Sequence, residues 1–316
     1  MSRHPFRTAS LALGLAALST TLVACGGSDD ESAAGTGDAT NAGSTSLTVV
    51  ATTNVWGDVV AAVGGDEVTV RSVISDPSQD PHSFEADTDT LLAVSKAAVI
   101  VENGGGYDDF MDTMIDSSDT DAVVVNAVET SGRTAAEGEE LNEHVWYDLP
   151  SVQKVAQQVA ATLGELDPDH AADFQANADT FSASLDDLIA QQAEAAAADT
   201  GLQIGITEPV PLYLTEAMGL TDATPEAFSE AIEEGDDVSV AVLQETLDLY
   251  ADGAVDALVY NEQTSGPITE QVRTAAEDAG IAVVPVTETL PEGEDFVSWM
   301  QATIDAVNAA VAAAAS

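Results

Sequence analysis

The chain has 316 residues, of which 45% are hydrophobic, and it carries 56 acidic against 7 basic side chains, for a formal net charge of −49. This charge excludes nucleic acid as a partner, because an acidic surface repels a phosphate backbone. The length suffices for two cores of about 100–150 residues each, so we expect two lobes.

The N-terminus has the pattern of an export signal. Two arginines within the first seven residues precede the apolar run 11–18, and the sequence LVAC ends at Cys25. A basic head, an apolar run too short to span a bilayer and small residues before a cleavage site are typical of secretory signals. LVAC followed by glycine resembles the bacterial lipobox. We therefore predict a signal peptide over residues 1–24 and a lipid on Cys25, the only cysteine, which leaves no disulfide.

Residues 25–46 hold almost nothing that could be buried, so they are predicted to form a flexible tether. Four short β-branched runs follow, separated by helical patterns, and this alternation is typical of βαβ units with a parallel sheet. The runs are residues 46–52, 67–74, 97–103 and 121–127. We predict an N-terminal α/β lobe over residues 47–168.

Two histidines of this lobe stand in ordered segments. His82 ends the loop SDPSQDPH, in which Pro77 and Pro81 restrict the backbone and can hold the imidazole in place. His144 lies in NEHVWYDLP, just before a helix for which Asp148 is the predicted N-cap. Taken singly, each has an ordinary alternative: a surface histidine for the first, and a histidine packed on two aromatic rings for the second.

Residues 169–198 lack Gly and Pro and place apolar side chains at helical spacing. They are predicted to form one linking helix, which at about 1.5 Å per residue is roughly 45 Å long and stiff. The second half again alternates strand and helix patterns, which predicts a C-terminal α/β lobe over 199–316. Its strand candidates are residues 202–207, 255–262 and 281–288, with a weaker one at 223–229.

Carboxylates follow the predicted strands of this second lobe. Glu208 comes after the first strand and Glu288 ends the last, while Glu262 is a competing candidate at another strand end. Ligands of open α/β sheets bind beyond the carboxyl ends of the strands, where loops and helix N-termini meet. Helix capping or chance remain the ordinary explanations for any one acidic residue in so acidic a chain. Together with the two histidines, however, these groups suit a divalent transition metal such as Zn²⁺ or Mn²⁺.

The chain resembles the zinc/manganese solute-binding lipoproteins of ABC transporters. The resemblance rests on DPHSFE, the N-G-x-G turn at residues 103–106, EHVWYD and TEPVPLYLTEAMGL, and it covers nearly the whole mature chain. It implies an α/β fold of two (β/α) lobes with mostly parallel sheets, joined by a long rigid backbone helix. It also implies a metal held between the lobes by four side chains. By motif position three of them are His82, His144 and Glu208, while Glu288 stands nearest to the fourth position, with Glu262 as its competitor. The family's fourth ligand is normally an aspartate, whereas this chain has Glu288.

The resemblance further implies an extracytoplasmic, lipid-anchored, monomeric protein that captures Zn²⁺ or Mn²⁺ and is not an enzyme. The sequence holds neither a G-x-x-x-x-G-K-[ST] phosphate loop nor an apolar stretch of about 20 residues beyond the signal. The resemblance therefore implies permease and ATPase partner subunits. Two alternatives stay open: a zinc hydrolase with Glu85 or Glu143 as general base, and a surface adhesion protein that uses the metal structurally.

Overall fold

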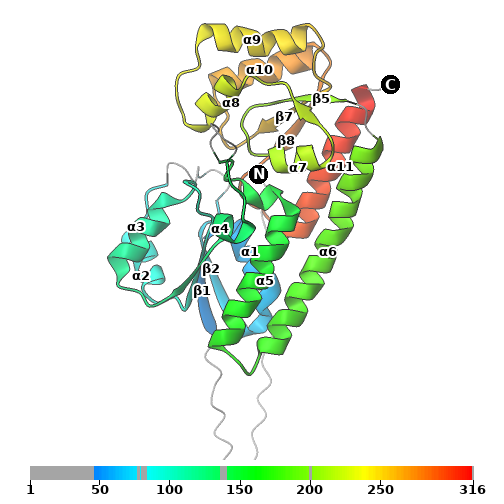
Figure 1. Ribbon diagram of the computed structural model, residues 1–316. Helices are drawn as coiled ribbons and strands as arrows, with labels where there is room; N and C mark the ends of the chain where they lie inside the picture. The colour runs from blue at the N-terminus through cyan, green and yellow to red at the C-terminus, as the bar shows by residue number, and fades with distance from the viewer. Residues whose placement is uncertain (1–45, 77–78, 80–83, 136–140, 199–200, 315–316) are drawn as a thin grey trace, which may run out of the picture. The chain divides into compact units, whose positions relative to one another are not determined.

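The computed structural model describes residues 46–76, 79, 84–135, 141–198 and 201–314, and these form two α/β lobes (Figure 1). The predicted signal peptide, the tether with Cys25, and His82 lie outside the described residues. Among those residues, no helix combines the length and the apolar character needed to cross a membrane. The lobe boundaries expected at 168/169 and 198/199 stay predictions.

The first lobe contains a parallel sheet of four strands in the order β2-β1-β3-β4. The strands are β1 (Leu47–Thr53), β2 (Val68–Ile74), β3 (Val99–Glu102) and β4 (Val123–Asn126). Each lies within one of the four predicted runs except that β1 extends one residue further, so this part of the prediction is confirmed. The central strands β1 and β3 are buried along most of their length, as a sheet covered on both faces requires.

The second lobe repeats this arrangement, with all strands parallel in the order β6-β5-β7-β8. The strands are β5 (Gln203–Ile206), β6 (Thr221–Asp222), β7 (Ala257–Asn261) and β8 (Ala282–Val286). The weaker strand candidate at 223–229 was wrong. The residues that pair as a strand are the two that precede this candidate, Thr221 and Asp222. Pro225 is the N-cap residue of helix α8 (Glu226–Glu233), which occupies the rest of the segment.

Helices cover the two sheets and connect them (Figure 1). Besides α8 they are α1 (Asn54–Gly64), α2 (Thr88–Val94), α3 (Asp109–Ser118), α4 (Ala127–Ser131), α5 (Leu149–Leu166), α6 (Ala171–Ala198), α7 (Leu212–Ala217), α9 (Val240–Ala251), α10 (Pro267–Asp278) and α11 (Phe296–Ala314). The predicted linking helix is α6. Its buried side chains, which recur every three or four residues, pack on α5 and α11. The main hydrophobic core contains these side chains together with buried residues of both sheets.

Helix α1 of the first lobe is fastened to the segment that follows β8 in the second. The side chain of Asn54 donates to Leu290 O (2.8 Å) and accepts from Leu290 N (2.9 Å). One turn further along, Asp58 accepts from the backbone N of Phe296 (2.9 Å), the first residue of α11. Burial raises the pKa of Asp58, although the hydrogen bond from Phe296 opposes this shift. The loop after β8 is therefore held by the other lobe.

Replacing Asn54 with alanine should lower the free energy of unfolding by about 1–3 kcal/mol, because both backbone groups of the buried Leu290 lose their partner. Urea unfolding of the metal-free protein measures this loss. The matched control is Gln271→Ala, which removes an exposed side-chain hydrogen bond to Pro267 O and should cost less than about 0.5 kcal/mol. Equal effects of the two substitutions would contradict a special role for Asn54.

Candidate metal centre

Three polar residues follow neighbouring strands of the second sheet at one edge. Glu208 stands two residues after β5, Asn261 is the last residue of β7, and Glu288 stands two residues after β8. Because β7 pairs with both β5 and β8 in parallel, the carboxyl ends of these strands are adjacent. All three side chains are buried, with 1 to 2% exposure.

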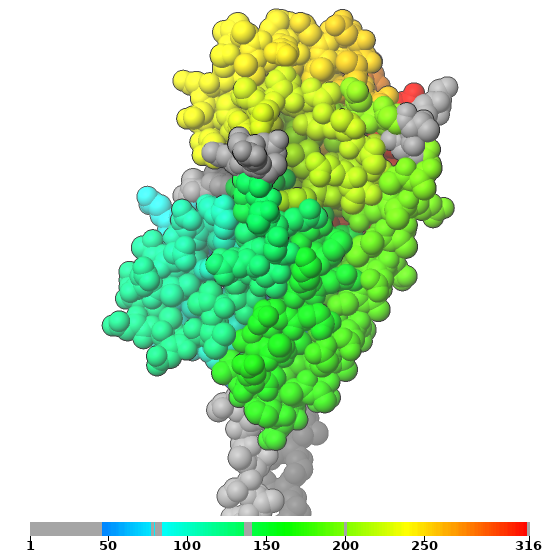
Figure 2. All heavy atoms as spheres, viewed as in Figure 1, coloured from blue at the N-terminus to red at the C-terminus, as the bar shows by residue number. Residues whose placement is uncertain are grey.

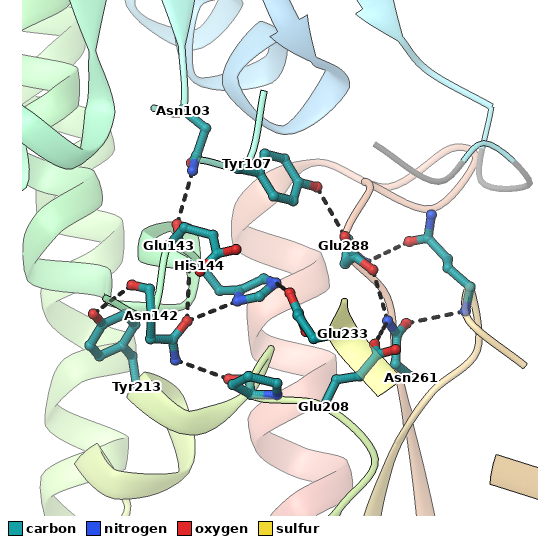
Figure 3. Close-up of polar contacts among 12 residues, drawn as sticks. Asn103, Tyr107, Asn142, Glu143, His144, Glu208, Tyr213, Glu233, Asn261 and Glu288 are labelled. Atoms are coloured by element: carbon teal, nitrogen blue, oxygen red, sulfur yellow. Dashed lines mark hydrogen bonds and ion pairs between the residues drawn. The ribbon is translucent and has the colours of Figure 1, made fainter. Parts of the chain in front are cut away.

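The amide of Asn261 joins the two glutamates (Figure 3). Its Nδ2 donates to Oε2 of Glu208 and to Oε1 of Glu288, the latter at 2.8 Å. From the first lobe, the hydroxyl of Tyr107 donates to the other oxygen of Glu288 at 3.2 Å. The two carboxylates therefore face one another across a single donor, at the junction of the lobes.

His144 approaches the same place from the first lobe. It precedes the short 3-10 turn Val145–Tyr147 and is completely buried. Asn142 orients it: Nδ2 of Asn142 donates to Pro209 O (3.0 Å), so its Oδ1 faces the histidine and accepts from His144 N (3.0 Å) and Nδ1 (2.8 Å). Since Nδ1 carries a proton for this bond, Nε2 is the atom that can bind a ligand.

The helix after His144 begins where the sequence predicts, at Leu149. Asp148 occupies the N-cap position, but its side chain does not accept from the first backbone N–H groups of α5. It accepts instead from the Ser151 hydroxyl and forms an ion pair with Arg133 at 2.8 Å. The expected N-cap is therefore correct in position and different in its hydrogen bonds.

Glu233, which the sequence analysis missed, contacts His144. It is the last residue of α8, its side chain is 8% exposed, and its Oε1 lies 3.2 Å from Nε2 of His144 (Figure 3). Ligand atoms of Glu143, His144 and Glu233 all lie within 4.8 Å of one another, a spacing compatible with a bound ion. No local motif distinguishes Glu233 from its neighbours Glu230 and Glu234.

The crowding of negative charge shifts the pKa values of this cluster. Burial by itself lowers the pKa of His144, but the charge of Glu233 and its contact with the ring, together with Glu143 and Glu288, raise that pKa to about 9. Burial and the charge of Glu233 raise the pKa of Glu208 to about 7, against the hydrogen bond from Asn261. Protons on these two groups offset part of the repulsion among the carboxylates, as a divalent cation also would.

The structure brings together three of the four predicted metal-binding residues: His144, Glu208 and Glu288. The fourth, His82, lies outside the described residues, as does the lipidation candidate Cys25. Glu262, the competing candidate, is exposed: it follows β7, whose residues are buried to the last one, Asn261. Of the two residues considered as a general base, Glu85 is exposed, whereas Glu143 is half-buried beside His144.

A cavity of about 940 Å³ adjoins the cluster and is lined by both lobes. Glu143 and Glu233 belong to its lining, so it reaches the His144 side of the cluster. Its remaining acidic lining residues are Glu216, Asp222, Glu226, Glu230 and Glu234. Figure 2 shows the face on which green segments of the first lobe meet yellow-green and yellow segments of the second.

The arrangement combines one imidazole and three carboxylates, all largely buried, from both lobes. Such a set offers nitrogen and oxygen donors to a divalent cation and carries the negative charge that the cation would neutralise. It does not by itself offer a nucleophile with an adjacent base, as covalent catalysis requires. The chemistry that fits these side chains best is reversible binding of a metal ion.

The chain matches the family model described as "Zinc-uptake complex component A periplasmic" over residues 49–310. It is 29% identical to the manganese-binding lipoprotein MntA of Halalkalibacterium halodurans, over 45% of this chain and 47% of that protein, so the match spans about half of this relative. It is 25% identical to the manganese ABC transporter substrate-binding lipoprotein scaA of Streptococcus gordonii, over 86% of this chain and 91% of that protein. The periplasmic zinc-binding protein TroA of Treponema pallidum has a similar fold, with a TM-score of 0.70, 20% identity and coverage of 84% of this chain and 99% of that one.

Proposed function

We propose, from the premise that this chain belongs to the zinc-uptake complex component A family, that it captures Zn²⁺ or Mn²⁺ outside the cytoplasm and delivers the ion to an ABC permease. The observation that carries the proposal is the convergence of His144, Glu208 and Glu288 from the two lobes on one buried place. A cargo ion bound there is enclosed by both lobes and can be released when they separate.

In this proposal His144, Glu208 and Glu288 supply three ligands, and His82 supplies a second imidazole. His82 has the motif position of a ligand in DPHSFE, and its loop follows β2, whose carboxyl end is at the same edge of the first sheet as that of β1. Glu233 is a further donor beside His144. Four side chains that fill the coordination positions leave none for a reactive water, which favours capture over hydrolysis.

The donor set admits both ions. Carboxylate oxygens suit Mn²⁺, imidazole suits Zn²⁺, and intrinsic affinity favours Zn²⁺ over Mn²⁺ at almost any site of this kind. The similar proteins include a zinc-binding protein and two manganese lipoproteins. We therefore propose one site that takes either ion, with the ion carried in the cell set by supply as well as by affinity.

The remaining parts of the proposal concern location and partners. A signal peptide over residues 1–24 and a lipid on Cys25 would anchor the chain outside the cytoplasmic membrane through the tether 25–46. The lipoprotein names of the relatives support this anchor. Permease and ATPase subunits supply membrane passage and nucleotide hydrolysis, and the capture component itself acts as a monomer and catalyses no reaction. The tether raises its effective concentration near the permease.

Purified mature protein, stripped with a chelator, should bind one equivalent of Zn²⁺ or Mn²⁺ and show a higher unfolding temperature with either ion than without. Stabilisation follows because the ion binds the folded state only. Calorimetric titration and thermal unfolding measure the two effects, and Mg²⁺ serves as the control ion, since it prefers an octahedral shell of oxygens. Binding of neither transition ion at micromolar concentration would rule the proposed function out.

A further inference from the structure

Asn261 occupies a position that the capture function does not explain by itself. It is the last residue of β7, the strand between those that lead to Glu208 and Glu288, and it is 1% exposed. Its backbone N donates to Oγ1 of Thr207, the residue before Glu208, at 2.9 Å. The fold therefore places this amide between the two candidate ligands from the second lobe.

The orientation of the Asn261 amide is fixed by its two ends. Oδ1 accepts from the backbone N of Gln263 at 3.1 Å, which directs Nδ2 toward the carboxylates. Nδ2 has two protons and donates to Glu208 and to Glu288. Both N–H groups of the amide therefore have an acceptor, and its oxygen has a donor.

We propose that Asn261 determines the metal selectivity of the site, by restraining the carboxylates of Glu208 and Glu288 so that neither turns both of its oxygens to the ion. The inference rests on the proposed function. A hydrogen bond to one oxygen restrains the rotation of a carboxylate, and a carboxylate binds an ion through both oxygens only when it turns both of them toward the ion.

The consequence is a low coordination number. Zn²⁺ is satisfied by four donors in a tetrahedral arrangement, whereas Mn²⁺ prefers a larger shell of oxygens. Two glutamates limited to one oxygen each therefore favour Zn²⁺. On the Glu288 side, Tyr107 reinforces the limit, because its hydroxyl donates to the second oxygen of that carboxylate.

The amide is also suited to this place by its lack of charge. A lysine between Glu208 and Glu288 would neutralise them and compete with the ion, and an aspartate would add a further buried negative charge. Asparagine supplies two donors from one nitrogen and leaves the full charge of both carboxylates to the cation.

The test is the ratio of the Kd for Mn²⁺ to the Kd for Zn²⁺, measured by competitive titration of the full mature chain. In Asn261→Ala the carboxylate of Glu208 is released and that of Glu288 keeps only the hydrogen bond from Tyr107, so the ratio should fall about tenfold, since an outer partner of a metal ligand typically changes affinity by about 10–100-fold. A general loosening of the structure would weaken both ions alike and leave the ratio unchanged.

Asn126→Ala is the matched control. Asn126 ends β4 in the other lobe, and its Nδ2 donates to Oε1 of Glu102 at 2.9 Å, a strand-end pair of the same kind that contacts none of the candidate ligands. Its ratio should stay within about twofold of the unsubstituted chain.

An unchanged ratio in folded Asn261→Ala overturns the proposal. If the unsubstituted chain binds neither ion, the proposed function itself is overturned. Circular dichroism of the metal-free variants reports folding. Should Asn261→Ala not fold, Asn261→Ser, which keeps a polar side chain too short to reach both carboxylates, carries the same expectation, and an unchanged ratio there has the same meaning.

Discussion

Replacing His144 with alanine is expected to weaken binding of Zn²⁺ at least about 100-fold, because removal of a direct donor costs more than removal of the groups that only orient donors. The fold should persist, since the metal-free protein already surrounds this residue with the rings of Tyr107 and Trp146. Calorimetric titration gives the affinity and circular dichroism checks the fold.

His170→Ala is the control for this substitution. His170 is partly exposed and interacts with Asp167 at 2.7 Å and with Glu67 at 3.7 Å, away from the candidate ligands. Its replacement should leave the affinity for Zn²⁺ within about twofold. An affinity of His144→Ala equal to that of this control would remove His144 from the site.

The affinity for the cargo ion should rise steeply with pH. The metal-free cluster holds a proton on His144, with a pKa of about 9, and below neutral pH a second on Glu208, with a pKa of about 7. An ion binds only the deprotonated groups, so it must displace these protons. The Kd should fall about 50-fold from pH 6 to 7 and about 15-fold from pH 7 to 8. Titrations in metal-free buffers measure both steps, and a flat profile would contradict the assignment.

The metal-free protein should show the opposite trend in stability. The raised pKa of His144 contributes stability that is present below pH 6.5, its ordinary pKa, and lost as pH rises through about 9. The raised pKa of Glu208 contributes stability present below 4.5 and lost as pH rises through about 7. The unfolding temperature measured with a chelator should therefore fall between pH 6 and pH 9. In Glu208→Gln one proton fewer is displaced, so the fall of the Kd between pH 6 and pH 7 should be about fivefold smaller.

Much of the fold follows from patterns within single segments. β-branched runs separated by helical segments predict parallel sheets, and the absence of Gly and Pro over 169–198 predicts α6. The weak strand candidate at 223–229 misled because it contains Thr, Phe and apolar residues in a short run. Pro225 and the acidic residue after it start a helix there instead, a competition that local β-propensity does not resolve.

Position after a strand or in a motif is the signal that makes His144, Glu208 and Glu288 candidates, and their roles as metal ligands stay predictions. Glu233 was missed because it reaches His144 only when the last turn of α8 packs against the first lobe, and 56 acidic residues give no local means of selecting it. Asn261 was missed because it is an uncharged residue at the end of a strand that is buried throughout, so no local pattern distinguishes it from its neighbours.

The attachment of the segment after β8 to α1 has a consequence for domain-swap engineering. Asn54 and Asp58 of the first lobe form hydrogen bonds with the segment between Glu288 and the start of α11. In a chimera that takes its two lobes from two homologues, α1 and the segment after β8 would come from different parents. The hydrogen bonds between them would then join residues that are not matched. Such a hybrid should take Glu288 through Phe296 from the same parent as α1.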